Sequence, residues 1–599
     1  MRTQFRPPAT DAPCLPDAAG RRLLIAATAI VCLVPAEVAL GSAGGRHRPR
    51  LEPIACAEVA THPRNRLLQS PLVKSLSSQI VPASGPNVSH CQVDLLFGTG
   101  PEQNINIRIG LPLSSLDGGT GGVEGAWNGR TQGVGGGGCA GTLNVAAPVN
   151  AGYVGSGTDT GHAGGSCEPG VNPDGTYNLQ FIEDFIRNAI KAQVRFSKSL
   201  ARTYYGMKPA YDYWNGCSTG GRQGYLLAQE LGRELDGILA NAPAIYWTRF
   251  QTAQMWGQIV MKDLVGGPID EAKLVQATVS AVDACDARDG VADGVIDDPR
   301  TCKFSAEENV CGTATAPAEN CLTPAEAEAI DMIWDGPRNA DGEKVWFGLD
   351  RGTQLGGSCF PFGCFSLNGT LPFFLGVTQF HWNERDPDFD WSTVAIEEYA
   401  QVAQAGSRNI ADVTDTFGDL DTFRRHGGKL LTFVGTNDQL IMPRGVIHYY
   451  RQMASRYAKR KGEPDFERLQ RFYRLFRAPG VAHCAGGPGP QPQGLFEALV
   501  SWVENGVPPE RILAQTTDTS GNVTRTRPLC PYPQTATYDG SGSTDDASNF
   551  VCKGDLDRPR VVCADVLTKY QREVRGPLDF RGTGVDRRQC SGKGHRGRR

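Results

Sequence analysis

The chain has 599 residues, too many for one small hydrophobic core, and this length predicts a large domain with an insertion or several domains. Hydrophobic residues make up 40% of the chain and charged residues 21%, a composition typical of globular proteins. The formal net charge of -4 gives no field that would attract a polyanion, so we do not expect a nucleic-acid partner.

Residues 1–43 have the order of an export signal. Arg21 and Arg22 precede an apolar run over residues 23–35, and small residues follow. The run is too short to anchor a protein in a bilayer, which favours a signal that is removed, although a short buried helix has the same pattern. We expect a secreted protein, extracellular or periplasmic, with no membrane contact after signal removal. The export route stays open.

The cysteines indicate the same compartment. Two of the 18 lie in the predicted signal, and the other 16 are an even number in a chain without a CxxC pair. This pattern favours disulfides over metal ligation. We expect disulfides at Cys56 and Cys91. Four closely spaced couples would close short surface loops: Cys285 with Cys302, Cys311 with Cys321, Cys359 with Cys364, and Cys530 with Cys552.

Strands and helices alternate along the chain. Apolar periodicity predicts two strands within 93–112, a helix over 179–205, a strand over 210–214, a helix over 224–231, a strand over 429–435, a helix over 445–457, a strand near 472–476 and a helix over 495–504. The run over 429–435 is almost continuously apolar, as in a strand buried on both faces. This alternation predicts an α/β fold with a mainly parallel sheet.

Residues 246–417 break this pattern with cysteine couples, aromatic residues and an acidic loop. We predict that they form an inserted lid domain, so that the catalytic domain comprises residues 50–245 and 418–555. Residues 556–599 would be a C-terminal extension, partly disordered, because its end is a basic tail. Cys563 and Cys590 in this extension could pair.

Ser218 lies in a glycine-flanked turn between a predicted strand and a predicted helix. Gly216 and Gly220 occupy the flanking positions of a G-x-S-x-G motif, whose sharp turn needs small neighbours and exposes the serine hydroxyl. Such exposure matters because a serine hydroxyl is a weak nucleophile without an adjacent base. A serine turn without a catalytic role has a similar local sequence.

Asp438 and His483 complete a candidate triad. Asp438 directly follows the buried strand, at the edge where α/β sheets place their sites, and His483 lies in a turn-rich segment downstream. Alone, either residue could be structural. With Ser218 they follow the chain order of α/β-hydrolases, which predicts a catalytic triad. The backbone N–H of Thr219 would be one donor to the oxyanion.

Cys217 directly precedes the serine and Cys484 directly follows the histidine. In this pattern the chain resembles the tannase and feruloyl esterase family, over residues 56–552. The resemblance implies an α/β-hydrolase core with a large inserted lid domain. It also implies a disulfide between Cys217 and Cys484, and a second oxyanion donor in the glycine-rich loop, at Gly136 or Gly137.

The resemblance implies hydrolysis of carboxylic esters of aromatic acids, such as feruloyl, galloyl or terephthalate monoesters. His483 would act as the base and Asp438 would hold its tautomer. Alternatives are a lipase or peptidase, a hydrolase of non-aromatic esters, or a non-catalytic secreted binding protein on the same fold. A small-molecule ester is the expected partner, and the oligomeric state stays open. Five lid aromatics could stack on substrate or form lid core: Phe373, Phe374, Phe380, Trp382 and Trp391.

Residues 286–297 form an acidic, glycine-containing stretch. Its closely spaced oxygen donors suit Ca²⁺, although it lacks the terminal glutamate and the spacing of an EF-hand. A solvated acidic turn is the alternative. The resemblance implies a structural calcium ion in the lid domain, held by the side chains of Asp286, Asp289 and Asp293 and the carbonyls of Val291 and Val295.

Overall fold

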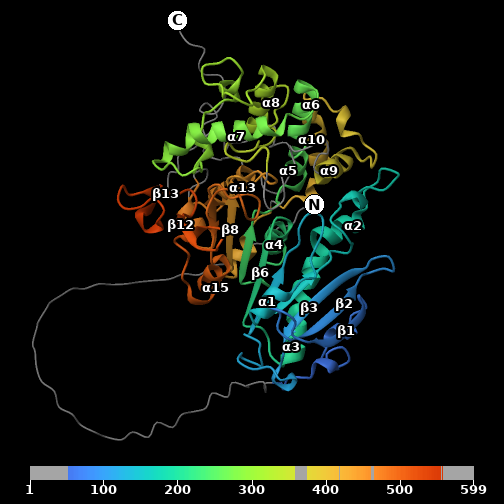
Figure 1. Cartoon of the computed structure of the whole chain (residues 1–599). Helices are drawn as coiled ribbons and strands as arrows, with labels where there is room; N and C mark the ends of the chain where they lie inside the picture. Colours follow the sequence, from blue (N-terminus) through green and yellow to red (C-terminus); the bar gives the residue numbers. More distant parts are fainter. Residues whose placement is uncertain (1–50, 358–373, 417, 460–463, 555, 557–599) are drawn as a thin grey trace, which may run out of the picture. The chain divides into compact units, whose positions relative to one another are not determined.

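The computed structural model describes residues 51–357, 374–416, 418–459, 464–554 and 556. A β-sheet forms its centre (Figure 1). The sheet has nine strands in the order β1-β2-β3-β5-β4-β6-β7-β8-β9. The strands are β1 (Val73–Val81), β2 (His90–Phe97), β3 (Ile105–Pro112), β4 (Arg130–Val134), β5 (Val154–Thr158), β6 (Tyr211–Cys217), β7 (Gly237–Asn241), β8 (Lys429–Gly435) and β9 (Tyr473–Ala478).

The sheet has an antiparallel part and a parallel part. Strands β1, β2, β3 and β5 pair antiparallel, whereas β5, β4, β6, β7, β8 and β9 pair parallel. Parallel strands need covered faces, and β7 and β9 are buried at every residue. Together with the helices described next, this arrangement confirms the predicted α/β-hydrolase class.

Helices cover both faces of the parallel part. Trp214, on one face, belongs to the same buried cluster as Tyr225 of α4 (Thr219–Glu230). The neighbouring residue Tyr213 belongs to a second cluster, with Leu499 of α15 (Leu495–Asn505). Adjacent residues of a strand point to opposite faces, so these two clusters form the two layers of the core. Two further helices pack on the sheet: α3 (Ala189–Tyr205), which contacts β5, and α13 (Pro443–Arg456), which contacts β8.

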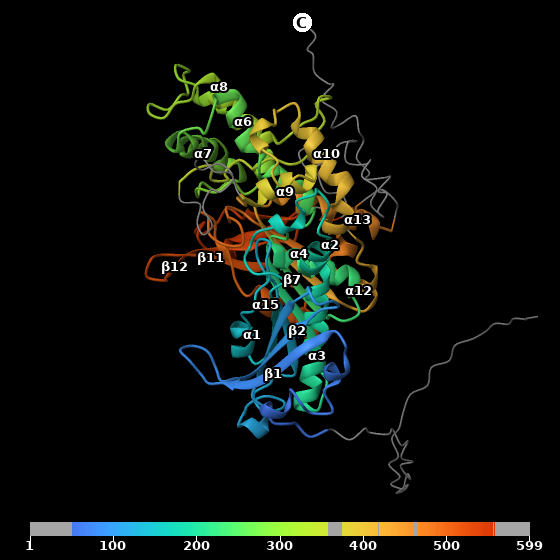
Figure 2. The same ribbon diagram turned by 90° about the vertical axis from the view of Figure 1, so that its right-hand side faces the viewer.

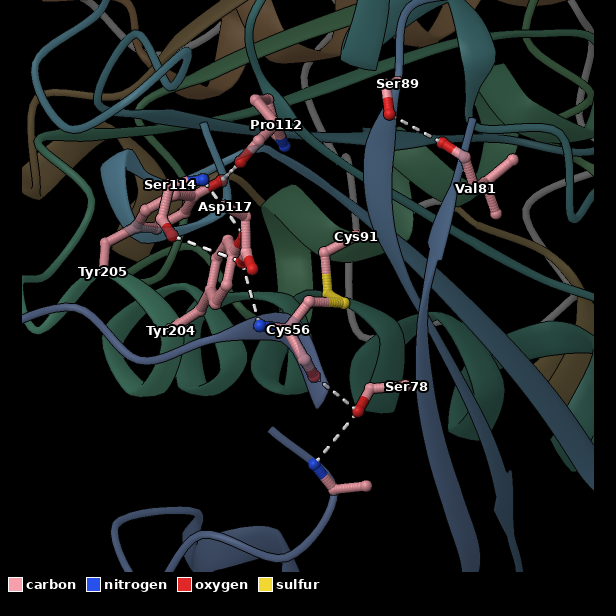
Figure 3. Close-up of a disulfide and its surroundings, with 11 residues drawn as sticks. Cys56, Ser78, Val81, Ser89, Cys91, Pro112, Ser114, Asp117, Tyr204 and Tyr205 are labelled. Atoms are coloured by element: carbon pink, nitrogen blue, oxygen red, sulfur yellow. Dashed lines mark hydrogen bonds between the residues drawn. A yellow bond between two sulfur atoms is a disulfide. The ribbon is translucent and has the colours of Figure 1, made fainter. Parts of the chain in front are cut away.

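The antiparallel part is fastened to the N-terminal segment by a disulfide between Cys56 and Cys91 (Figure 3). Near it, the carboxylate of Asp117 accepts hydrogen bonds from the N–H of Cys56, at 2.8 Å, and from the hydroxyl of Tyr204, at 2.5 Å. The hydroxyl of Ser78 donates to the carbonyl of Cys56 at 2.8 Å. These contacts join the first described residues to β1, β2 and α3.

The other disulfides test the cysteine predictions. Cys285–Cys302, Cys311–Cys321 and Cys530–Cys552 are present as expected. Cys139–Cys167 was not predicted, because its partners lie 28 residues apart and form no closely spaced couple. Cys359, Cys364, Cys563 and Cys590 lie outside the described residues.

Several elements carry no clear sequence signal. The predicted helix over 179–205 is interrupted by a π-helical turn, Asp184–Asn188, between α2 (Leu179–Glu183) and α3. Strand β5 lacks apolar alternation because a Cβ at Gly157 would lie 2.3 Å from the carbonyl oxygen of Thr142, so this strand needs glycine. Beyond α15 the chain forms further short strands that the sequence did not indicate: β11 (Ile512–Thr517), β12 (Val523–Leu529), β13 (Thr535–Tyr538) and β14 (Phe550–Lys553), with β10 (Gln491–Pro492) pairing to β11.

The segment predicted as a lid lies between β7 and β8 and is helical. Its helices α6 to α10 gather together in both views (Figures 1 and 2). The lid boundaries at 246 and 417 stay a prediction. The helices of this segment are α5 (Trp247–Ala253), α6 (Trp256–Val265), α7 (Glu271–Cys285), α8 (Pro324–Asp335), α9 (Phe374–Glu384), α10 (Tyr399–Asn409) and α11 (Ala411–Thr414).

A buried ion pair attaches this insertion to the core. The guanidinium Nε of Arg444, on α13, lies 2.7 Å from Oδ1 of Asp350, and both side chains are 8% exposed. Close by, the side-chain amide of Asn437 donates to the carbonyl of Gly352 at 2.6 Å. Asn437 directly precedes Asp438, so one lid loop rests beside the candidate triad.

None of the helices in the described ranges is both long and apolar enough to cross a membrane.

Candidate active site

Ser218 occupies a strained turn between β6 and α4. Its backbone angles are φ 61° and ψ -123°, outside the regions that L-residues usually adopt. The turn is held on both sides: the N–H of Ser218 donates to the carbonyl of Asn241 at 3.0 Å, and its carbonyl accepts from Ala244 at 3.1 Å. A Cβ at Gly216 would lie 2.6 Å from the carbonyl carbon of Gly220. The backbone therefore has the sharp strand-turn-helix geometry that the glycine motif predicted.

Asp438 and His483 lie together and are almost fully buried. The Nδ1 atom of His483 lies 2.9 Å from Oδ2 of Asp438, so Nδ1–H donates to the carboxylate. The other oxygen of Asp438 accepts from the N–H groups of Leu440, at 2.9 Å, and Ile441, at 2.8 Å. These bonds orient the carboxylate. A proton fixed at Nδ1 leaves the lone pair of the imidazole at Nε2, where a base would need it.

The disulfide between Cys217 and Cys484 brings the serine turn and the histidine loop together. Its cysteines are 267 residues apart in the chain, but their Cα atoms are 6.0 Å apart. Ser218 follows one cysteine and His483 precedes the other. The pairing implied by the family resemblance is confirmed, and the structure places all three predicted triad residues at one edge of the sheet.

The glycine-rich loop lies on the first turn of α4. The N–H of Gly136 donates to the side-chain carbonyl of Gln223 at 3.1 Å, and the carbonyl of Gly136 accepts from the N–H of Gly220 at 2.8 Å. The hydroxyl of Thr219 donates to the carbonyl of Gly138. Gly136 therefore cannot also donate to an oxyanion. No described residue accepts from the N–H of Gly137, which leaves it as the candidate for the second donor.

His162 supports the same loop. Its Nε2 contacts the carbonyl oxygen of Cys139, and its ring centroid lies 4.5 Å from that of Phe181. The disulfide Cys139–Cys167 adds a covalent tie. The loop that follows the four glycines is thus held by a histidine and a disulfide.

Arg222 places a buried positive charge in the first turns of α4. Its guanidinium lies over the rings of Phe185, at 4.7 Å, and Trp247, at 5.4 Å. Among the described residues no carboxylate forms an ion pair with it, and burial lowers its pKa to about 9. The charge adds to the positive end of the helix dipole, from which the Thr219 N–H emerges. Arg222 lies outside the G-x-S-x-G motif, and the sequence did not predict a role for it.

The lid aromatics divide into core and surface. Phe380 and Trp382 are fully buried, and the indole N–H of Trp382 donates to the carbonyl of Cys167 at 3.0 Å. They are lid core rather than a surface for a substrate ring. Phe374 is 50% exposed, and Trp391 is partly buried against the core. Phe373 lies outside the described residues.

The carboxylates of the acidic loop after α7 contact the loop backbone and arginines of β12. Asp286 accepts from the N–H groups of Asp293, at 3.1 Å, and Gly294, at 2.8 Å, while Asp293 forms an ion pair with Arg527 of β12. Burial, followed by the carboxylates of Asp293 and Asp286, raises the pKa of Asp289 to about 6. In the described part of the chain, no three His, Cys, Asp or Glu side chains form a group that could hold a metal. Calcium stays a prediction.

Comparison with known proteins points to one family. Residues 123–553 match the family model described as tannase and feruloyl esterase. A probable feruloyl esterase of Arthroderma benhamiae is 33% identical over 79% of this chain and 88% of its own length.

Two solved structures share the fold. Tannin acyl hydrolase from Aspergillus niger has a TM-score of 0.70 and 23% identity, over 86% of this chain and 100% of the other. Feruloyl esterase B from Aspergillus oryzae has a TM-score of 0.67 and 24% identity, over 80% of this chain and 96% of the other.

Removal of the disulfide beside the triad is expected to impair catalysis more than folding. In Cys217→Ala/Cys484→Ala, the histidine loop loses its covalent tie to the serine turn, and kcat should fall about 10- to 100-fold, because small displacements of reacting groups are costly. The measurement is steady-state hydrolysis of an activated phenyl ester. Cys530→Ala/Cys552→Ala is the matched control and should keep its kcat. Equal losses in both variants would contradict the prediction.

Proposed function

Because the chain belongs to the tannase and feruloyl esterase family, and is therefore a carboxylic ester hydrolase, we propose that it cleaves esters of phenolic acids through Ser218, His483 and Asp438. The observation that carries the mechanism is the buried Asp438–His483 pair, which a disulfide joins to the turn of Ser218. A binding protein on a hydrolase shell would not need a strained serine turn beside an oriented histidine.

In the proposed reaction, Nε2 of His483 takes the proton of the Ser218 hydroxyl as the oxygen attacks the ester carbonyl. The tetrahedral intermediate carries a negative oxygen, which accepts hydrogen bonds from the N–H groups of Thr219 and Gly137. His483 then gives the proton to the leaving alcohol, and the acyl group remains on Ser218. A water activated by His483 releases the acid, while Asp438 stabilises the imidazolium in both steps.

Ser218→Ala removes the nucleophile and should abolish hydrolysis of phenolic esters, with a loss of at least about 10³-fold in kcat. Asp438→Asn should keep the fold and lower kcat about 10⁴-fold, because the amide favours the wrong imidazole tautomer. The kcat of each variant is to be measured from initial rates of hydrolysis of p-nitrophenyl acetate and methyl ferulate. Retained activity in Ser218→Ala would refute the proposed mechanism.

The acyl group is proposed from the relatives, one of which is named a probable feruloyl esterase. Feruloyl, galloyl and terephthalate monoesters are the candidates. We expect ethyl ferulate or ethyl gallate to have a higher kcat/KM than ethyl hexanoate, which has the same leaving group. Hydrolysis of mono(2-hydroxyethyl) terephthalate, measured alongside, tests the third candidate acyl group. A preference for the hexanoate would contradict the phenolic specificity but leave the serine mechanism intact.

We also propose secretion, supported by the apolar run near the N-terminus and by the disulfides, which form and persist in oxidising compartments.

A structural calcium ion in the loop of residues 286–297 is a further proposal. It rests on oxygen donors packed into one short loop, which the disulfide Cys285–Cys302 closes. Arg527 competes with a cation for Asp293. Purified protein is expected to contain one calcium per chain by metal analysis, and chelation should lower its Tm. Arg527→Gln should bind calcium more tightly, since it removes one of the two arginines, Arg525 and Arg527, that form ion pairs with Asp293. No bound calcium in either protein would refute the proposal.

A further inference from the structure

We propose that Gln223 is a positioning residue that sets the oxyanion hole: it occupies the N–H of Gly136 and so turns the next N–H, that of Gly137, toward the reacting ester. This inference rests on the proposed serine mechanism. It adds a residue that the nucleophile motif does not contain.

The peptide of Gly136 is held at both ends by α4. Its N–H donates to Oε1 of Gln223 at 3.1 Å, and its carbonyl accepts from the N–H of Gly220 at 2.8 Å. Gly220 and Gln223 lie two and five residues after Ser218 on the same helix. The helix that begins at the nucleophile therefore also fixes the orientation of the glycine loop.

The backbone around this peptide is closely packed. A Cβ at Gly135 would lie 2.3 Å from the Cα of Gly220, and a Cβ at Gly136 would lie 2.1 Å from the carbonyl oxygen of Ala140. A Cβ at Gly137 would meet nothing within 4 Å. The loop is thus packed tightly against the helix at Gly135 and against its own following residues at Gly136. It opens into free space at Gly137, where a substrate oxygen could be received.

The side-chain amide of Gln223 uses its oxygen but not its nitrogen in the hydrogen bonds of the described residues. Its side chain is 1% exposed, and its Nε2 has no hydrogen-bond partner among the residues that the structure describes. The amide cannot be reversed, because Nε2 would then face the N–H of Gly136, donor against donor. A buried donor without a partner is unfavourable for stability. The hydrogen bond from the N–H of Gly136 offsets this cost, which points to a role of Gln223 in the geometry of the glycine loop.

The position of the Gly137 N–H matters only when negative charge develops on the substrate oxygen. Gln223 should therefore affect kcat for both acylation and deacylation and leave KM and product binding nearly unchanged. A residue that acts through general stability would instead lower Tm without changing the rate of folded enzyme.

Gln223→Met tests the inference, because methionine keeps the length and removes the strong acceptor. We expect kcat on methyl ferulate to fall about 10- to 100-fold, with KM within about threefold. Inhibition by phenylboronic acid, whose adduct with serine places an oxygen in the oxyanion hole, should weaken by a similar factor. Inhibition by ferulate should not change.

Gln223→Glu restores an acceptor for the N–H of Gly136. It is expected to recover activity relative to Gln223→Met, most fully at acidic pH, where the new carboxyl is neutral and adds no charge near the oxyanion. Gln229→Met, on the same helix, is the matched control. Within the described ranges the Gln229 amide donates to the Tyr449 hydroxyl, at 3.3 Å, and not to the glycine loop, so this variant should keep wild-type kcat.

The inference is overturned if Gln223→Met keeps wild-type kcat and boronate inhibition, even with a lowered Tm, since Gln223 would then be merely structural. It is also overturned if Gln223→Glu is as impaired as Gln223→Met at every pH. Ser218→Ala distinguishes failure of the serine mechanism from failure of the role of Gln223. An active Ser218→Ala variant refutes the serine mechanism. An inactive Ser218→Ala variant together with a fully active Gln223→Met variant refutes only the role of Gln223.

Discussion

The disulfide between Cys217 and Cys484 is the constraint on which the catalytic geometry depends. It connects the residue before the proposed nucleophile, Ser218, to the residue after the proposed base, His483, across 267 positions of the chain. Closure of so long a loop restricts the unfolded chain. Its local effect matters more for catalysis, because the histidine loop is rich in turns and would otherwise rely on hydrogen bonds alone. The bond of His483 to the buried Asp438 then fixes the remaining rotation of the ring.

The first turns of α4 organise the other half of the site. The six residues from Ser218 to Gln223 include the proposed nucleophile, a candidate oxyanion donor in Thr219, the two anchors of the glycine loop, and the buried charge of Arg222. The Arg222 guanidinium donates to the carbonyls of Ile186 and Phe185 but forms no ion pair with a described carboxylate, and burial of such a charge opposes folding. Its place at the positive end of a helix makes it a source of potential that favours an anion. Stability and catalysis therefore make opposite demands on this turn.

The insertion is joined to the core beside the site rather than far from it. Asn437, next to Asp438, holds the lid carbonyl of Gly352, and the buried pair of Arg444 and Asp350 lies in the same region. Residues that differ between lids can thus alter the space around the triad without changing the triad. This arrangement suits a core with one chemistry that accepts different acyl groups.

Local sequence patterns are enough to predict the triad candidates, the α/β class and most of the long helices and strands. These patterns are a glycine-flanked serine, an aspartate after an apolar run, and apolar residues that recur with a period of 2 or 3.6 residues. The family resemblance supplied the cysteine pair beside the triad. The preference for Gly137 over Gly136, the pairing of Cys139 with Cys167, and the contacts of Gln223, Arg222 and Arg527 emerge from the folded structure alone. Each of these depends on contacts between residues far apart in the chain, and such contacts leave no spacing or period in the sequence.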